Sequence, residues 1–285
     1  MKLNNKPFIG ILAFIVVLFT MPLGHAVMIL IEKIFGPSGQ FPGATVLGIV
    51  GAVLLWMGAR NQDETPATWY GFFGGLLLWT GWVEFSFVWS AQHLGIAPLL
   101  ENGEIVTKPE YLMMPSSLGL LLASMLYFLF NGQTRCHFFS WIQRKLKLNI
   151  SRIPTGKHRN FAIITAMETL FILWFFYLVL LLIYDNRLLG DRHPVTYVVF
   201  ASSLIWSLYL FIRLIKFKKM AAAVRYAIPT VIIFWNAVEI LGRWDFFKEI
   251  WVEPLDYALE MGIILVAFII VTALTLLTPE ATESA

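Results

Sequence analysis

The chain has 285 residues, of which 58% are hydrophobic and only 14% are charged, with a formal net charge of +3. Soluble domains carry about 25% charged residues, so this composition excludes an ordinary soluble globular protein. The apolar residues form blocks of roughly 20, the length that an α-helix needs to cross about 30 Å of hydrocarbon. A β-barrel would instead alternate apolar and polar residues over about ten positions. The sequence therefore predicts an all-α, polytopic transmembrane helix bundle.

A single cysteine, Cys136, excludes an intrachain disulfide and every metal site that needs several cysteines. Glycine-rich phosphate loops, zinc-finger spacings and RNA-binding signatures do not occur in the sequence. Nucleic-acid binding therefore has no support, and the sequence names no cofactor.

The first apolar run follows a short basic segment. Residues 1–26 resemble a signal peptide that ends at Ala26, but the run continues to Ile31, which is too long for such a segment. We therefore expect an uncleaved first span, which a turn at residues 36–42 ends. The eight predicted spans are residues 8–31, 44–57, 69–90, 115–130, 161–184, 195–214, 226–242 and 255–277.

Positive charge is concentrated on one side of this predicted topology. With a cytoplasmic amino terminus, most of the 21 Lys and Arg residues fall in cytoplasmic segments, which is the positive-inside pattern. We therefore expect a bacterial inner-membrane protein with both termini in the cytoplasm. The most basic segment, residues 135–159, has aromatic residues followed by cations, and it suits anionic lipid headgroups. An ordinary positive-inside loop is the alternative interpretation.

A short pattern, Val-Glu-x-x-x-x-Trp, occurs twice, with Glu84 and Trp89 in the third span and Glu239 and Trp244 in the seventh. The pattern predicts an internal repeat of two halves with four spans each, residues 1–130 and 161–285, joined by the basic connector 131–160. Because each half has an even number of spans, the halves would share one orientation in the membrane.

Acidic side chains inside membrane spans cost free energy and usually mark functional sites. Glu84 and Glu239 each lie about 20 Å from the cytoplasmic start of their helices, at the rise of 1.5 Å per residue. His25 reaches a similar depth. These residues predict a polar cavity that opens outward and binds a ligand or carries protons. The candidate residues are Glu84, Glu239, His25, Trp89, Trp244, Tyr111, Tyr257 and Glu260.

The two acids differ in their neighbours along the helix. Arg243 lies four residues after Glu239, so an ion pair between them would satisfy that acid without any function. The corresponding neighbour of Glu84 is Val88, which cannot pair with it. We therefore expect Glu84→Gln to abolish activity while the protein accumulates normally, and Glu239→Gln mainly to reduce stability.

Three classes of function fit these features. The favoured class is binding or transport of a small or lipid-like ligand. The second is a membrane-embedded enzyme, metal- or carboxylate-dependent, that acts on a lipid or quinone at the outer leaflet. The third is a structural subunit with membrane-protein partners. We predict no metal site, because His25, His93 and His193, the weak candidates, show no ligand spacing on one helix.

Reporter fusions test the predicted topology directly. Because the basic loops should stay in the cytoplasm, a periplasmic reporter should be active at three positions and a cytoplasmic reporter at three others. The first set is Gly39, Gly103 and Gly190, and the second is Gln62, Gly156 and Met220. A cytoplasmic signal at Gly190 would contradict the predicted orientation.

Overall fold

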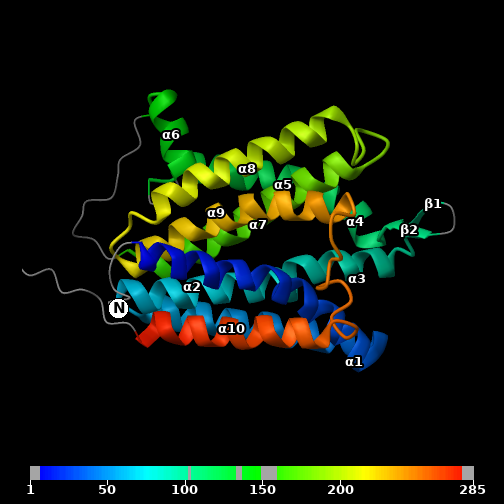
Figure 1. Cartoon of the computed structure of the whole chain (residues 1–285), viewed down its shortest axis with the longest axis horizontal. Helices are drawn as coiled ribbons and strands as arrows, with labels where there is room; N and C mark the ends of the chain where they lie inside the picture. Colours follow the sequence, from blue (N-terminus) through cyan, green and yellow to red (C-terminus); the bar gives the residue numbers. More distant parts are fainter. Residues whose placement is uncertain (1–6, 102–103, 133–136, 149–158, 278–285) are drawn as a thin grey trace, which may run out of the picture. The chain divides into compact units, whose positions relative to one another are not determined.

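The protein is mostly helical in its computed structural model, which describes residues 7–101, 104–132, 137–148 and 159–277 (Figure 1). A short π-helix, η1 (Trp79–Glu84), joins α2 to α3, and a 3₁₀ turn, η2 (Met114–Ser117), joins α4 to α5. The α-helices are α1 (Phe8–Arg60), α2 (Glu64–Leu78), α3 (Phe85–His93), α4 (Pro109–Met113), α5 (Leu118–Phe130), α6 (His137–Lys145), α7 (Phe161–Tyr184), α8 (Pro194–Leu214), α9 (Met220–Arg243) and α10 (Ala258–Leu277).

The described residues contain eight helices that are long and apolar enough to cross a membrane, as predicted. Helix α1 provides two of them, because Gly36 has φ 68° and ψ −177° and separates the two halves. A positive φ favours glycine, which has no Cβ. The α2–η1–α3 and α4–η2–α5 segments each form one continuous span. The chain is therefore a multi-pass transmembrane helix bundle, whereas the internal repeat stays a prediction.

The connector before the fourth span has more structure than the sequence predicts. Strands β1 (Leu99–Glu101) and β2 (Glu104–Thr107) pair antiparallel, with Leu100 opposite Ile105. Helix α4 follows, with Pro109 in its first turn, where the missing amide hydrogen of proline has no cost. The fourth span consequently begins several residues earlier than the predicted Pro115.

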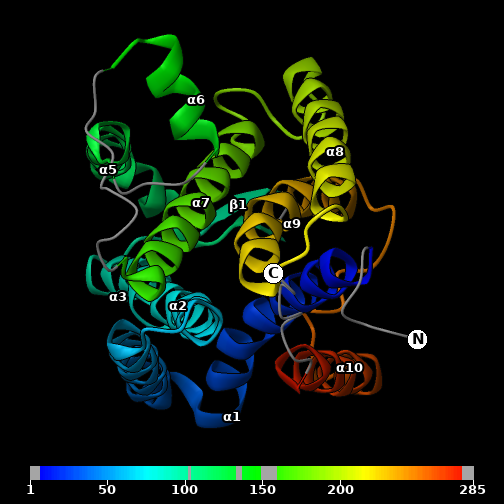
Figure 2. The ribbon, with the colours of Figure 1, turned by 90° about the vertical axis from the view of Figure 1, so that its left-hand side faces the viewer.

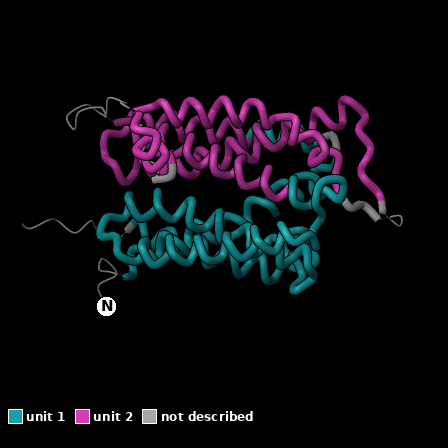
Figure 3. Tube along the Cα trace, turned by 90° about the horizontal axis from the view of Figure 1, so that it is seen from above, with its two compact units in different colours: residues 1–46, 182–285 teal, residues 47–181 magenta. Residues whose placement is uncertain are grey.

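The chain divides into two compact units (Figure 3). Unit 1 comprises Met1–Val46 and Leu182–Ala285, and it therefore contains the first half of α1 together with α8, α9 and α10. Unit 2 comprises Leu47–Leu181, which holds the second half of α1 and the segments from α2 to most of α7.

Helix α9 is the central element of unit 1. Of the residues in its most apolar stretch, 72% are buried, against 11% for α10. Helices α8 and α9 lie side by side (Figure 2). The ring of Phe14, from α1, lies 4.9 Å from Phe211 of α8 and 6.0 Å from Phe234 of α9. The exposed apolar side chains of α8 and α10 suit contact with lipid, which is as apolar as they are.

Small residues bring the helices of unit 2 close together. Gly71 and Gly75 of α2 lie against the backbone of Ala162 and Ala166 in α7. Such small-residue faces are common between membrane helices, because they let the backbones approach and pack. Asn160, just before α7, donates a hydrogen bond from Nδ2 to the Ala59 carbonyl of α1, 3.0 Å away.

The close contact at Gly71 predicts a position-specific loss of stability. A Cβ at Gly71 would overlap the Ala162 carbonyl, so Gly71→Ala should lower the free energy of unfolding by about 1–3 kcal/mol. At Gly119 of α5 a Cβ would meet no atom within 4 Å, so Gly119→Ala should be neutral or stabilising by about 0.5–1 kcal/mol. Unfolding by sodium dodecyl sulfate in mixed micelles measures both. Equal stability of the two variants would contradict the packing described for α2 and α7.

Candidate functional site

The Glu239 carboxylate is held by two other side chains within unit 1. Its Oε1 accepts a hydrogen bond from Nε1 of Trp235, one turn earlier on α9, at 2.6 Å. Nε2 of His25, on the first half of α1, lies 3.4 Å from the same oxygen. The His25 and Trp235 rings are stacked, with centroids 6.3 Å apart. An acid, an imidazole and an indole from two spans therefore meet at one oxygen atom.

A second carboxylate, Glu249, folds back from the segment between α9 and α10 onto the end of α9. It lies against Gly242, where a Cβ would overlap the carboxylate. Burial, followed by the negative charge of Glu239, raises the pKa of Glu249 to about 7, while the charges of His25 and Arg243 oppose the shift. The charge of Glu239 therefore acts on Glu249.

Tyr184, the last residue of α7, lies beside these charges. Its hydroxyl oxygen is buried and has no hydrogen-bond partner among the described residues. The charges that act on this hydroxyl are those of Glu239, Arg243, Glu249 and Asp191. The Arg243 guanidinium lies 5.5 Å from the centre of the Tyr184 ring. A buried, unsatisfied hydroxyl is uncommon in native proteins and indicates a position where a water or a ligand atom would bind.

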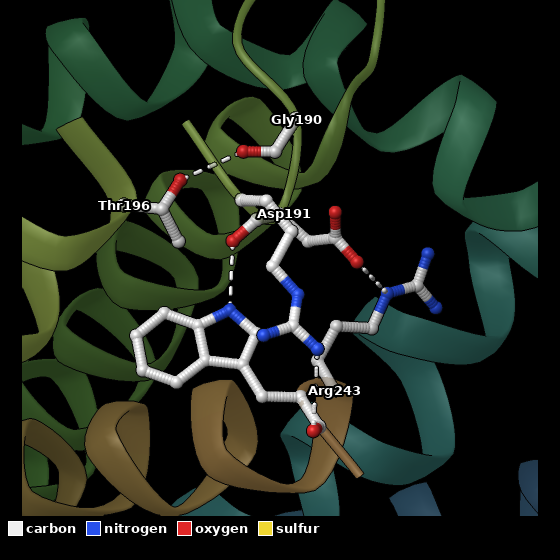
Figure 4. A network of polar contacts seen from close by, with 6 residues as sticks. Gly190, Asp191, Thr196 and Arg243 are labelled. Atoms are coloured by element: carbon white, nitrogen blue, oxygen red, sulfur yellow. Dashed lines mark hydrogen bonds and ion pairs between the residues drawn. The ribbon is translucent and has the colours of Figure 1, made fainter. Parts of the chain in front are cut away.

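The loop between α7 and α8 is fastened to the end of α9 by a network of polar contacts (Figure 4). Arg243 Nε lies 3.9 Å from an oxygen of Asp191, and Nε1 of Trp244 donates to the Asp191 carbonyl at 2.8 Å. Thr196 donates to the Gly190 carbonyl at 2.8 Å. Trp244 is only 8% exposed and packs on Tyr197. Trp244 therefore holds the loop between α7 and α8 against the end of α9.

The other sequence-predicted residues lie elsewhere. In unit 2, Glu84 is half-buried at the end of η1. Trp89 is 47% exposed and stacks on His93 at 5.0 Å, and Tyr111 lies 5.9 Å from Tyr177. In unit 1, Tyr257 is half-buried just before α10, and Glu260 is exposed in its first turn. Of the predicted residues, the structure brings His25 and Glu239 together.

The stretch around Glu84 has an unusual backbone, because residues 79–84 form a π-helix. Such π-helical turns are rare and are frequent at functional sites. Trp79, which is 5% exposed, lies 6.0 Å from Tyr177, and Trp82 lies directly on Gly48 of α1. The matching stretch before Glu239 is a regular part of α9. The two copies of the sequence pattern therefore differ in backbone conformation.

The histidines named as weak metal candidates have separate surroundings. His25 faces Glu239 and His93 stacks on Trp89. His193 accepts a hydrogen bond at Nδ1 from the amide of Val195 and caps the start of α8. No group of three or more His, Cys, Asp and Glu residues in the described ranges could hold a metal ion.

Sequence reasoning missed Glu249, Tyr184 and Asp191. All three lie at or beyond the ends of spans, where spacing along a helix gives no information about tertiary contacts. The predicted ion pair between Glu239 and Arg243 stays a prediction. The structure describes other contacts for both residues. Glu239 contacts His25 and Trp235, and Arg243 contacts Asp191.

No protein-family model matches the sequence, and no curated protein or solved structure is significantly similar to it. We call the group formed by His25, Trp235, Glu239 and Glu249 the acidic cluster, and Tyr184 lies beside it.

The raised pKa of Glu249 predicts how stability depends on pH. Between about pH 4.5 and 7 the folded protein keeps a proton that the unfolded chain has lost, so stability should fall as the pH rises through this window. Glu249→Gln cannot ionise, and it should flatten this part of the profile. Above pH 7 it should be more stable than the wild type by about 1 kcal/mol, less than the full shift implies because Glu249 is partly exposed.

Detergent unfolding at a series of pH values measures this effect. Glu260→Gln, at an exposed acid of α10, is the control and should keep the wild-type profile. Gly242→Ala should flatten the profile as Glu249→Gln does, because its Cβ displaces the Glu249 carboxylate, whereas Gly262→Ala, in open space on α10, should not. A wild-type slope in Glu249→Gln would contradict the described environment of this acid.

Proposed function

We propose that the acidic cluster is a proton-exchanging binding site through which this membrane protein binds or transports a small or lipid-like ligand. The observation that carries the proposal is the shared Oε1 atom of Glu239, which contacts His25 Nε2 at 3.4 Å and Trp235 Nε1 at 2.6 Å. Acids inside spans are retained mainly where they bind or move ions and substrates.

The chemistry of the pair favours proton exchange. Imidazole titrates near neutral pH, and its charge changes whether a neighbouring carboxylate stays ionised. The His25 and Glu239 side chains are 25% and 18% exposed, respectively. A proton that arrives at one of them changes the charge available to a ligand at the other. Glu249, which comes from outside the span, adds a second titratable group on which the charge of Glu239 acts.

Aromatic side chains beside the acids support a ligand with an apolar part. Trp251 lies 4.8 Å from Trp235, and Phe247 lies 5.9 Å from Trp251. Ligand sites are commonly apolar and aromatic with a few polar groups that fix orientation. Tyr184 supplies such a group, because its hydroxyl is buried without a hydrogen-bond partner among the described residues.

The distribution of positive charge predicts which side of the membrane the acidic cluster faces. With both termini in the cytoplasm of a bacterial inner membrane, the carboxyl end of α9 and the following Glu249 face outward. The acidic cluster would then exchange protons and ligand with the outer side.

Carbodiimide labelling tests the proposal on the full-length protein. Dicyclohexylcarbodiimide reacts with protonated carboxyl groups in apolar surroundings and leaves an adduct that peptide mass spectrometry locates. We expect labelling of Glu239 that increases as the pH falls, because the acid must be protonated to react. Glu239→Gln should abolish this adduct, whereas Glu260→Gln should leave it unchanged. His25→Phe should shift the pH at which labelling declines, because it removes the imidazole that contacts the carboxylate.

Two outcomes would contradict the proposal. One is Glu239 labelling that does not change with pH, which would mean that the acid does not exchange protons. The other is a His25→Phe profile identical to that of the wild type, which would mean that the two groups do not share a proton equilibrium.

A further inference from the structure

The short helix α6, in unit 2, packs against the spans α5 and α7. It runs across the axes of α5 and α7 (Figures 1 and 2). Phe139 attaches it to both of these helices, because it is 2% exposed and its ring lies 5.5 Å from Phe128 and 5.2 Å from Phe171. Since α5 and α7 are spans, a helix that crosses them runs along the plane of the membrane.

Gln143 fixes α6 onto the end of α5. Its side chain is 9% exposed, and Nε2 donates to the Leu129 carbonyl at 2.9 Å, with Phe128 and Asn131 carbonyls at 3.5 and 3.4 Å. The last carbonyls of a helix have no partner within the helix and need an outside donor. The position of α6 at the end of this span is therefore set by buried contacts.

The opposite side of α6 and the turn that follows it at residues 146–147 are exposed and carry both cations and apolar groups. Arg144, Lys145 and Lys147 are exposed, as are Trp141 at 52% and Leu146 at 59%. Cations with an exposed tryptophan and leucine form the pattern of helices that lie in the headgroup region of a membrane. We call these five residues the basic face of α6.

Lys147 takes a position that glycine usually occupies. Its φ is 51°, and the helix ends with Leu148 N–H donating to the Gln143 carbonyl and Lys147 N–H to that of Arg144. These two bonds define a Schellman ending, whose left-handed residue is normally glycine. A lysine there strains the backbone, and it holds a third cation beside Arg144 and Lys145.

We propose that the basic face of α6 binds the headgroups of anionic phospholipids at the membrane surface. The cations complement the phosphate charge, while Trp141 and Leu146 have the apolar character that suits the acyl boundary. Buried contacts of Phe139 and Gln143 hold the helix in this orientation before a lipid arrives. The predicted basic segment extends from residue 135 to 159, of which residues 135–136 and 149–158 lie outside the described ranges.

Lipid retention by the purified full-length protein tests this surface. The protein is exchanged in mixed micelles of phosphatidylcholine and phosphatidylglycerol, and the bound lipids are counted by native mass spectrometry. We expect the wild type to retain phosphatidylglycerol preferentially. The triple variant R144Q/K145Q/K147Q should lose affinity for it by about fivefold per charge removed. The matched control K216Q/K218Q/K219Q, which removes three exposed cations between α8 and α9, should retain it as the wild type does.

A single variant separates lipid binding from a purely structural role. Lys147→Gly removes both the charge and the strained backbone, so it should raise the thermal midpoint of the protein while weakening phosphatidylglycerol retention. If the cations served only the helix dipole, the triple variant would lose stability equally in both lipids and keep its lipid preference, which would overturn the proposal. Displacement of the lipid by inorganic phosphate would indicate a free-phosphate site and would also overturn it.

Discussion

The structure of unit 1 depends on one constraint, which is that a carboxylate within a membrane span needs polar partners. Glu239 obtains them from Trp235 on its own helix and from His25 on a helix distant in sequence. Helix α9 is the most buried of the eight spans, so its acid can be reached by several neighbours. The loop between α7 and α8 and the segment after α9 then add Asp191 and Glu249. The need of the Glu239 carboxylate for polar partners thus brings several charged and polar side chains together in unit 1.

Much of the architecture could be predicted from the sequence, because span length and apolarity are local properties. The eight spans and the break near Gly36 follow from composition and from glycine alone. The sequence does not predict the hairpin before α4, because strands of three and four residues are too short to show the alternation of a β-strand. The basic segment was recognised from its charges, but the anchoring of α6 through Gln143 depends on a contact with residues twelve or more positions away.

The candidate site was predictable only in part. Depth along the helices placed His25 and Glu239 at one level, and they are in contact. Spacing along α9 identified only Arg243 as a partner that could satisfy Glu239, because a sequence pattern shows which residues are neighbours on one helix and not which residues of other helices they contact. The return of Glu249 over Gly242 lies beyond any pattern, since it depends on the absence of a single Cβ. Sequence reasoning favoured Glu84 over Glu239, whereas the described contacts with His25 and Trp235 are those of Glu239.

The π-helix at residues 79–84 affects the direction of the Glu84 side chain, because it changes how many residues fill one helical turn. A π-helical turn accommodates one more residue than an α-helical turn, and each residue rotates an α-helix by about 100°. Deleting one residue from this stretch would restore α-helical geometry, and everything before it would turn by that angle relative to Glu84 and α3. The direction in which Glu84 faces its own unit is therefore encoded as a single inserted position in the chain.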